Sequence, residues 1–464
     1  MKNLILVICF LSSLSSKAQT PQVSLNLDWE IPFTFANQAM TIEHDQLDRN
    51  YIYVAGKEAG LLIYDISGTP NKVKTITKNQ LDTLDVMGVT QNGNYLYLAL
   101  GNSFGSGEYS GMAIVDVTTP ALATISDVYK KYSGSKTGGG IVKTEGNYAY
   151  FGAMGNGLMI FDVSDKNNII FKSALTPDIN YPDANPDPAK YNARGMAVRN
   201  DTVYLCYDAG GLRIIDATNK LNPSQIGQYS NPAMNGKPRA YNNIVLQDSL
   251  AYIAVDYAGM EVLNIKNPSS ITLVSWWNPW GTANWFASRG HANEIQYDAD
   301  SKLIFMSTGK SDINVVSVAN PASPDSITMF GGINNNQGTW GLGLYKNKIY
   351  AGYIFVPLCI PFCSNWGGVK EISWSVLTGM EETKNTTTLL YPNPSTGFVT
   401  LQINTSDKGK VEIYDLLGKR VYHENFAEGT KQIQLSLDHL STGNYTMSIK
   451  TKECVMYNKL LLQH

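Results

Sequence analysis

The sequence has little charge, and no apolar run in it is long enough to cross a membrane. Asp, Glu, Lys and Arg make up 16% of the 464 residues, and the formal net charge is −3. There is no basic patch or Lys/Arg-rich segment, which argues against nucleic acids and anionic membrane surfaces as partners. A transmembrane helix needs about 20 consecutive apolar residues. The composition therefore predicts neither a nucleic-acid-binding protein nor a membrane-spanning one.

Catalytic sequence motifs are missing as well. The chain contains no Gly-x-Ser-x-Gly elbow, no His-Glu-x-x-His pair and no phosphate-binding loop. Among its five histidines we single out His291, which has Glu294 nearby in sequence. Residues three apart on a strand point to opposite faces, which weakens an acid–base pair between these two. An enzyme is unsupported by the sequence, although it is not excluded.

Cysteine is scarce, with five residues in the chain. Cys359 and Cys363 lie in one short loop, and an exported protein meets the oxidising conditions in which such a pair forms a disulfide. A shared metal is the weaker alternative, because no second cysteine pair or nearby histidine completes four ligands. We therefore expect a disulfide and no metal at this pair.

The N-terminus has the pattern of a secretory signal peptide. Lys2 supplies the positive start, an apolar run extends from Leu4 to Leu14, and Ser16-Lys17-Ala18 is a small-residue cleavage site. The run is too short to span a bilayer. We expect residues 1–18 to be removed on export to the periplasm.

What the chain has in abundance is a repeat of about fifty residues. Its centre, the repeat motif, begins with Gly, is rich in β-branched residues and has Asp or Asn at its sixth position, as in Gly60–Ser67. An aromatic residue stands seven positions before the Gly in most copies, for example Tyr53. A period of this length made of short strands is typical of propeller blades. The good copies begin at Gly60, Gly111, Gly157, Gly211 and Gly259, and a weaker copy covers Asp312–Val318.

We predict an all-β chain with a seven-bladed β-propeller over residues 19–377. An aromatic strand at Lys348–Gly352 and a degenerate one at Gly368–Trp374 indicate a seventh blade without an outermost strand. The alternating segment Val23–Ile31 resembles the last strand of other blades, so we expect it to complete the seventh blade and close the ring. The motif Asp is expected to cap a turn, since nearly every blade has one.

The repeat motif resembles the LVIVD repeat of exported bacterial and archaeal β-propellers, and the resemblance covers residues 38–375. It implies the propeller fold and an extracellular setting. It implies no agreed activity, so the function has to come from the residues themselves.

The C-terminal part has a different character. Residues 378–390 are polar and Thr-rich, which predicts a linker. In residues 391–464, the segments Tyr391–Gly397 (YPNPSTG), Tyr414–Lys419 (YDLLGK) and Gly443–Tyr445 (GNY) resemble the type A C-terminal sorting domain of the Bacteroidetes type IX secretion system. The resemblance implies a small Ig-like β-sandwich handled by that secretion machinery, and a destination at the cell surface or in the medium. An adhesive Ig-like sandwich is the alternative.

Candidate ligand-binding residues stand where the inner strands start, because propeller ligands usually bind at the central channel. These residues are Arg194, Arg239, Arg289, His291 and Trp340. Three arginines on neighbouring blades would form a cationic rim able to bind carboxylates or sulfates. Alternatively, each Arg satisfies strand-end carbonyls or pairs with an Asp of the next blade. In an enzyme, His291 would be the base and Arg289 the charge stabiliser.

The first of two insertions in the repeat is Asp178–Pro188, which spaces oxygen-bearing side chains two apart, as calcium loops do. Asp183, Asn185 and Asp187 are the calcium candidates. Pro188 stands where such a loop needs Gly, so a rigid, solvated loop is the favoured interpretation and calcium the lesser one.

The second insertion carries Trp276, Trp277, Trp280 and Trp285. Exposed, these rings would stack on sugars or anchor a protein partner, and Trp277 and Trp280 are the candidates we name. Buried, they would pack between blades. Together these patterns predict an exported binding or interaction module with a glycan or surface protein as partner. The alternatives are an extracellular polysaccharide lyase or hydrolase using the same funnel, and a structural surface protein.

Overall fold

The structure is a computed structural model, and it describes most of the chain. The described residues are 21–34, 38–101, 109–131, 138–281, 289–332, 335–359, 362–377, 388–403, 407–416, 418–451 and 455–464. The predicted signal peptide, Trp285 and most of the predicted linker lie outside them. The chain divides into two compact units, Met1–Leu377 and Thr378–His464.

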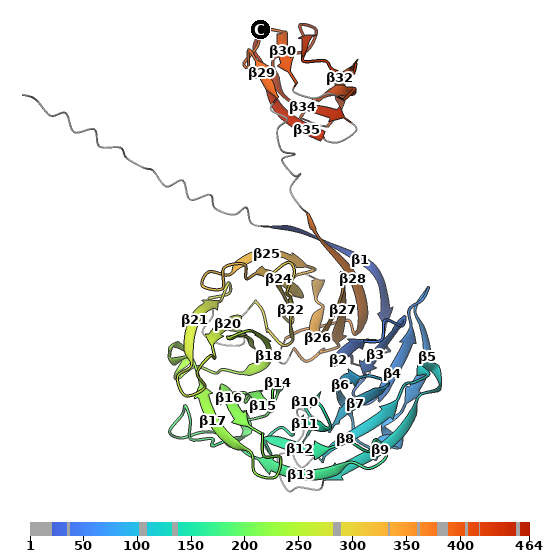
Figure 1. The fold of residues 1–464 in the computed structure, drawn as a ribbon, viewed down its shortest axis with the longest axis vertical. Helices are drawn as coiled ribbons and strands as arrows, with labels where there is room; N and C mark the ends of the chain where they lie inside the picture. Colours follow the sequence, from blue (N-terminus) through green and yellow to red (C-terminus); the bar gives the residue numbers. More distant parts are fainter. Residues whose placement is uncertain are drawn as a thin grey trace, which may run out of the picture. The chain divides into compact units, whose positions relative to one another are not determined.

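The described part of the first unit contains seven four-stranded antiparallel sheets, and Figure 1 shows them as blades arranged in a ring. The strands of each blade are given from the inner to the outer one. Blade 1 consists of β2 (Thr41–His44), β3 (Tyr51–Ala55), β4 (Leu61–Asp65) and β5 (Asn71–Ile76), and blade 2 of β6 (Val86–Asn92), β7 (Tyr95–Leu100), β8 (Ser110–Asp116) and β9 (Thr124–Lys131). Blade 3 consists of β10 (Ile141–Glu145), β11 (Tyr148–Gly152), β12 (Leu158–Asp162) and β13 (Ile170–Leu175). Blade 4 consists of β14 (Gly195–Arg199), β15 (Thr202–Cys206), β16 (Leu212–Asp216) and β17 (Ser224–Tyr229), and blade 5 of β18 (Tyr241–Gln247), β19 (Leu250–Val255), β20 (Met260–Asn264) and β21 (Thr272–Trp277). Blade 6 consists of β22 (Ile295–Asp298), β23 (Leu303–Ser307), β24 (Ile313–Ser317) and β25 (Asp325–Phe330). Short 3-10 helices in the connections are η1 (Lys78–Leu81), η2 (Pro120–Leu122), η3 (Pro188–Lys190) and η4 (Pro232–Met234).

The seventh blade joins the two ends of the propeller. It consists of β26 (Gly338–Tyr345), β27 (Lys348–Ile354), β28 (Gly368–Leu377) and β1 (Gln22–Pro32). Strand β1 pairs antiparallel with β28, from Gln22 opposite Leu377 to Pro32 opposite Gly368. Inner strand β26 also contacts inner strand β2 of blade 1. The predicted closure by the N-terminal strand is confirmed, and it pairs a sheet edge that would otherwise be open.

The repeat motif explains why blades 1 to 5 fold alike. Gly60 has φ +88°, and a Cβ there would lie 2.1 Å from the carbonyl oxygen of Ile76, so glycine is required. At the other end of the motif, Asp65 Oδ1 accepts a hydrogen bond from the backbone N–H of Ser67 at 2.8 Å. The same bond joins Asp116 to Thr118, Asp162 to Ser164, Asp216 to Thr218 and Asn264 to Lys266. The predicted turn-capping role of the motif Asp is therefore confirmed.

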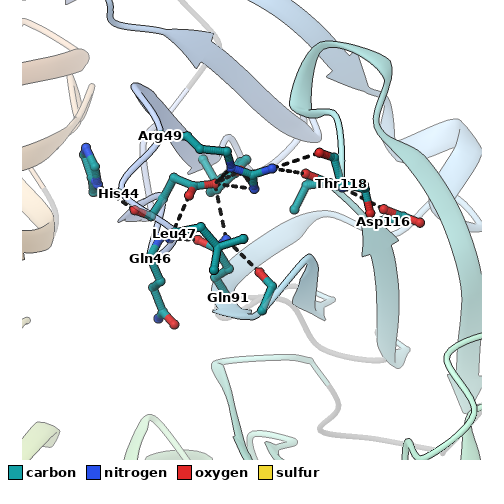
Figure 2. A network of polar contacts seen from close by, with 11 residues as sticks. His44, Gln46, Leu47, Arg49, Gln91, Asp116 and Thr118 are labelled. Carbon is teal, nitrogen blue, oxygen red and sulfur yellow. Dashed lines mark hydrogen bonds and ion pairs between the residues drawn. The ribbon is translucent and has the colours of Figure 1, made fainter.

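Blades 1 and 2 are tied by one buried ionic network, shown in Figure 2. The fully buried carboxylate of Asp45 accepts hydrogen bonds from Arg49 Nη2 at 2.6 Å and from the Tyr53 hydroxyl at 2.5 Å. Arg49 Nη1 donates to the carbonyls of Val117 and Thr118, each at 2.9 Å. Burial alone would raise the pKa of Asp45, but these hydrogen bonds outweigh it and the pKa is lowered.

The second unit is a two-sheet sandwich, as the sequence predicts. Its described strands form a three-stranded and a four-stranded sheet, β29 (Leu389–Tyr391), β30 (Phe398–Gln402) and β33 (Gln432–Ser436), and β32 (Arg420–Phe426), β31 (Gly409–Tyr414), β34 (Gly443–Thr451) and β35 (Val455–Leu462). The two sheets share one apolar core, in which Leu401 and Leu435 pack with Ile413 and Met447.

Candidate functional site

One position of the repeat lies where each blade meets the start of the next. It stands four residues after the aromatic residue of the second strand, and its backbone forms β-bridges to the entry of the following blade, for example from Asp208 to Tyr241 and from Asp256 to Ala292. Blades 4 and 5 have a carboxylate at this position and the other blades do not. The copies, from blade 1 to blade 7, are Lys57, Gly101, Met154, Asp208, Asp256, Gly309 and Ile354.

Asp256 of blade 5 orients His291 at the entry to blade 6. His291 Nδ1 lies 2.8 Å from Asp256 Oδ1, and the backbone N–H of Ala292 donates to the Asp256 carbonyl at 2.7 Å. The His291 side chain is 1% exposed. With Nδ1 held by a carboxylate, the ring orientation is defined. Among the described residues, His291 Nε2 is a buried atom without a hydrogen-bond partner.

Asp208 of blade 4 is held by side chains from the segment that enters its own blade. Asn192 Nδ2 donates to Asp208 Oδ2 at 3.0 Å, and Arg194 Nε lies 3.5 Å from the same oxygen. Burial raises the pKa of Asp208, Arg194 and Asn192 oppose the rise, and the charge of Asp256 adds to it. The two carboxylates are therefore close enough to repel each other, although they belong to different blades.

Asn242, at the start of blade 5, completes this group. Its Nδ2 donates to the Ala292 carbonyl at 2.8 Å, which places it beside His291. Its Oδ1 is buried and has no partner among the residues that the structure describes. We call the group the central cluster: Arg194, Asp208, Asn242, Asp256 and His291. Of these, the sequence predicted Arg194 and His291, and comparing the repeat copies position by position would have added Asp208 and Asp256.

An aromatic side chain from the seventh blade covers the histidine. Cys359 and Cys363 form a disulfide, and Phe362 beside it is 3% exposed. The Phe362 ring centroid lies 5.4 Å from that of His291 and 6.4 Å from that of Trp340. Trp340 is half-buried. The predicted candidates His291 and Trp340 thus both contact an aromatic residue that the sequence analysis did not single out.

The predicted arginines Arg194 and Arg239 both have carboxylate partners. Arg239 is almost fully buried; its Nη2 donates to Asp183 Oδ2 at 2.6 Å and its Nε to the Ala209 carbonyl at 2.8 Å. Arg289 is exposed. The positive charges of Arg194 and Arg239 are therefore balanced within the chain, and the cationic rim stays a prediction that depends on Arg289.

The calcium candidates lie in the Asp178–Pro188 insertion, to which Arg239 is joined by its ion pair with Asp183. Asp183 Oδ2 also accepts from the Tyr191 hydroxyl at 3.0 Å, and Asp187 Oδ1 accepts from the backbone N–H of Ala189 at 3.0 Å. Asn185 is exposed. Within the described residues, no three His, Cys, Asp or Glu side chains are grouped as metal ligands. Asp183 and Asp187 thus both accept hydrogen bonds from protein donors, and calcium at this insertion stays a prediction.

The candidate tryptophans lie between blades 5 and 6. Trp277 is 7% exposed, its Nε1 donates to Ser326 Oγ at 2.9 Å, and it packs with Ile304 of blade 6. Trp280 packs edge-on against it, with ring centroids 5.8 Å apart. Trp276 and Trp277 line a groove, but the contacts of Trp277 leave little of its ring for stacking. The role of Trp277 and Trp280 in binding remains a prediction.

Family comparisons agree with both parts of the chain. An LVIVD repeat model matches residues 47–73, 140–176 and 239–278, and a model described as a secretion system C-terminal sorting domain matches residues 389–463. The chain combines LVIVD repeats with a secretion sorting domain. The third repeat match of this LVIVD propeller contains all of blade 5, including Asn242 and Asp256. The sorting domain implies export by type IX secretion, to the cell surface or the medium.

Solved structures support the fold alone. The LVIVD propeller is similar to the β-propeller domain of Cps50 (Swd1) from Myceliophteria thermophila, with 11% identity, a TM-score of 0.52, and coverage of 76% of this chain and 100% of that chain. A chain of the Mitotic Checkpoint Complex is similar with 12% identity, a TM-score of 0.52, and coverage of 76% and 96%. No curated protein matches the chain. Within the described residues, no helix has the length and apolar character that a membrane crossing requires.

Proposed function

We propose that this exported propeller is a binding module whose ligand site is the central cluster. The observation that carries the proposal is that blades 4 and 5 have Asp208 and Asp256 at a repeat position where the other blades have Lys, Gly, Met or Ile, and that Asp256 pairs there with His291 at the entry to blade 6. The repeat itself supplies the control, because the same backbone position folds without a carboxylate in five other blades. A structural requirement alone would not place a carboxylate at this position in two consecutive blades and in none of the other five.

The unsatisfied atoms of the cluster support a ligand. A buried polar atom without a partner costs about 1–3 kcal/mol relative to a hydrogen-bonded one. His291 Nε2 and Asn242 Oδ1 are two such atoms, and both lie next to Ala292 in the described structure. Proteins retain such groups where they serve a function, so a ligand that supplies both hydrogen bonds would recover the cost.

The charge balance favours an uncharged, hydroxyl-rich ligand, such as a neutral glycan. The cluster holds the carboxylates of Asp208 and Asp256 against the one guanidinium of Arg194. If Nδ1–H of His291 donates to Asp256, then Nε2 is an acceptor, as is Asn242 Oδ1. Hydroxyl groups would donate to these acceptors, whereas a carboxylated or sulfated ligand would meet two negative charges. Trp340 nearby offers part of an apolar face.

Thermal unfolding with oligosaccharide pools tests the proposal. All eight Trp residues precede residue 378, so Trp fluorescence reports on the propeller within the full mature chain. A ligand at a hundred times its Kd stabilises the native state by about 2.7 kcal/mol and raises the midpoint. We expect a rise with a neutral pool, its loss in Asp208→Asn and Asp256→Asn, and no change in the response of Lys57→Met, which alters the same repeat position in blade 1.

Two results would overturn the proposal. If no pool raises the midpoint, the cluster binds no glycan. If sulfated or carboxylated pools raise it instead, and Arg289→Ala alone removes the effect, the ligand binds to the cationic rim rather than to the central cluster.

An enzyme is the second candidate, and the Asp256–His291 pair favours it specifically. A histidine held at Nδ1 by a carboxylate, with Nε2 unpartnered, is the arrangement of a general base. Turnover of whichever glycan binds, lost in His291→Ala while binding persists, would identify a hydrolase or lyase. Binding without turnover in the wild-type chain would leave the binding module as the function.

A further inference from the structure

Blade 6, whose entry segment supplies His291 to the central cluster, has no side chain at the repeat position of Asp208 and Asp256. Asp208 and Asp256 stand there in blades 4 and 5, and Gly309 stands there in blade 6. A Cβ on Gly309 would lie 2.8 Å from Phe362 Cε1 and 3.0 Å from His291 Cβ. The Phe362 ring thus occupies the space that a blade 6 side chain would take, directly against His291.

A second glycine makes room for the other edge of the same ring. A Cβ on Gly338, the first residue of β26, would lie 2.0 Å from Phe362 Cε2. Phe362 also belongs to the apolar group that contains Val86 and Met87 from blade 2. The Phe362 ring therefore packs between Gly309, Gly338 and His291. Any larger residue at either glycine would fill the space that the ring occupies.

We propose that Phe362, held by the Cys359–Cys363 disulfide, is a positioning residue of the central cluster. It closes the cluster toward blade 7 and keeps the His291 ring against Asp256. The inference rests on the proposed function, since it concerns how the same ligand site is assembled. It also predicts that the site is complete only in the oxidised chain, and so only after export.

The exposure of the residues in this loop supports the dependence of the site on the disulfide. Phe362 is 3% exposed, whereas Cys359 and Cys363 are both exposed. A reductant can therefore reach the disulfide while the propeller stays folded. The bridge joins the residue next to Phe362 to a point three residues before it, which restricts where the ring can go. Reduction by a dithiol transfers two electrons to the disulfide, yields two thiols and removes that restriction.

Chemical labelling of histidine tests the proposal in the full mature chain. Diethyl pyrocarbonate acylates accessible imidazole nitrogens, and peptide mass spectrometry reports each of the five histidines separately. In the oxidised chain we expect His291 to be protected, as its 1% exposure requires. After reduction by dithiothreitol and removal of the excess reductant, which would itself consume the reagent, and in the Cys359→Ser/Cys363→Ser variant, we expect labelling of His291 to rise roughly tenfold or more, because modification follows the accessible population.

The chain supplies its own controls. His44 is buried in blade 1, so its continued protection shows that the propeller is folded, and His423, His439 and His464 are exposed and report the reagent. Phe362→Ala should reproduce the effect of reduction, and Phe362→Leu should restore most of the protection. If His291 stays protected in the reduced chain and in Phe362→Ala, the proposal is wrong. If His44 becomes labelled together with His291 on reduction, the reduced propeller has unfolded, and labelling of His291 in oxidised Phe362→Ala then tests the proposal.

The outcome is separable from that of the proposed function. Protection of His291 is measured without any ligand, so it tests the role of Phe362 even if no glycan binds. If a glycan does bind, reduction should weaken it by roughly tenfold, in parallel with the labelling. Unchanged affinity in the reduced chain, with His291 newly accessible, would show that the disulfide positions the ring but not the ligand.

Discussion

Blades 1 to 3 and blades 4 to 7 share one repeat and use it differently. Two residues after the motif Gly, the first three blades have Leu62, Ala113 and Met159. The next four have Arg213, Glu261, Asn314 and Lys370 at the same position, and Arg213 and Glu261 are fully buried. The second half of the ring thus carries polar groups where the first half packs apolar ones, although the backbone is the same.

The two halves also differ in how well their buried polar groups are satisfied. In blade 1, Asp45 is buried with Arg49 and Tyr53 as partners. Among the described propeller residues, the buried polar side-chain atoms without a partner are all in blades 4 to 7 or their connections, namely Tyr207 Oη, Arg213 Nε, Tyr229 Oη, Ser230 Oγ, Asn242 Oδ1, His291 Nε2, Asp312 Oδ2 and Trp374 Nε1. A repeat protein that departs from its own pattern in consecutive blades, at a cost in stability, indicates where its function lies.

The largest effect is expected from removing the hydrogen-bonded carboxylate of Asp45 in blade 1. Asp45→Ala removes the carboxylate that the half-buried Arg49 guanidinium and the buried Tyr53 hydroxyl share, and because Arg49 keeps its bonds to the Val117 and Thr118 carbonyls, the cost is about 3 kcal/mol, the lower end for breaking a buried pair. We expect the free energy of unfolding of the propeller to fall by that amount, measured by urea unfolding with Trp fluorescence. Arg49→Lys, which keeps the charge but not the paired geometry, should cost less. A change below about 1 kcal/mol for Asp45→Ala would contradict the assignment of this network to stability.

The second test uses the pH dependence of the other half. Burial raises the pKa of Glu261 to about 7, although Tyr241 and Asn231 donate hydrogen bonds that lower it. The folded state therefore holds this proton more tightly than the unfolded state. The stability that this provides is present below about pH 4.5 and is lost as the pH rises through about 7.

We accordingly expect the free energy of unfolding to fall between pH 5 and pH 8, with Glu261 accounting for about 2 kcal/mol of the fall. Glu261→Gln keeps the size of the side chain and cannot ionise, so the fall should be smaller in this variant by that amount. Urea unfolding at four pH values across the range measures it. Parallel curves for the two proteins would mean that Glu261 does not titrate in this window.

Much of the fold is predictable from the sequence because blades repeat the same local chemistry. The motif Gly and Asp, and the period-two pattern of Val23–Ile31, each have one physical explanation, and they locate the blades and the closing strand. The site is less predictable, because the partner of a charged side chain at a strand end depends on which segment of the chain covers that end. Arg239 stands at the expected inner-strand start, yet Asp183 of the insertion covers it. Phe362 follows no periodic pattern, so no sequence rule links it to His291.

A third test asks whether a departure from the repeat costs stability, as the comparison implies. Asp208→Asn removes a buried carboxylate whose pKa is raised by burial and by the charge of Asp256. Although the ion pair between Asp208 and Arg194 is lost, we expect the propeller to become more stable by about 1 kcal/mol at pH 7.5 and to gain less at pH 5. Ligand binding should be lost in the same variant. A clear loss of stability at both pH values would make Asp208 a structural residue.

The smallest expected effect concerns the part of the repeat that both halves keep. Asp65 in blade 1 and Asp216 in blade 4 accept the same capping hydrogen bond, at 2.8 and 2.9 Å. Replacing either by Ala should lower the free energy of unfolding by about 0.5–1 kcal/mol, since one exposed cap is lost in each. Because the two sites are far apart and share no partner, the double variant should show the sum. Equal costs would show that blades 1 and 4 remain the same scaffold at this position, so that the difference between the halves lies in individual polar side chains and not in the scaffold. A cost at Asp216 that is several times larger would instead mean that the whole of blade 4 is less stable, and the unsatisfied polar groups there would reflect a weak blade rather than a ligand site.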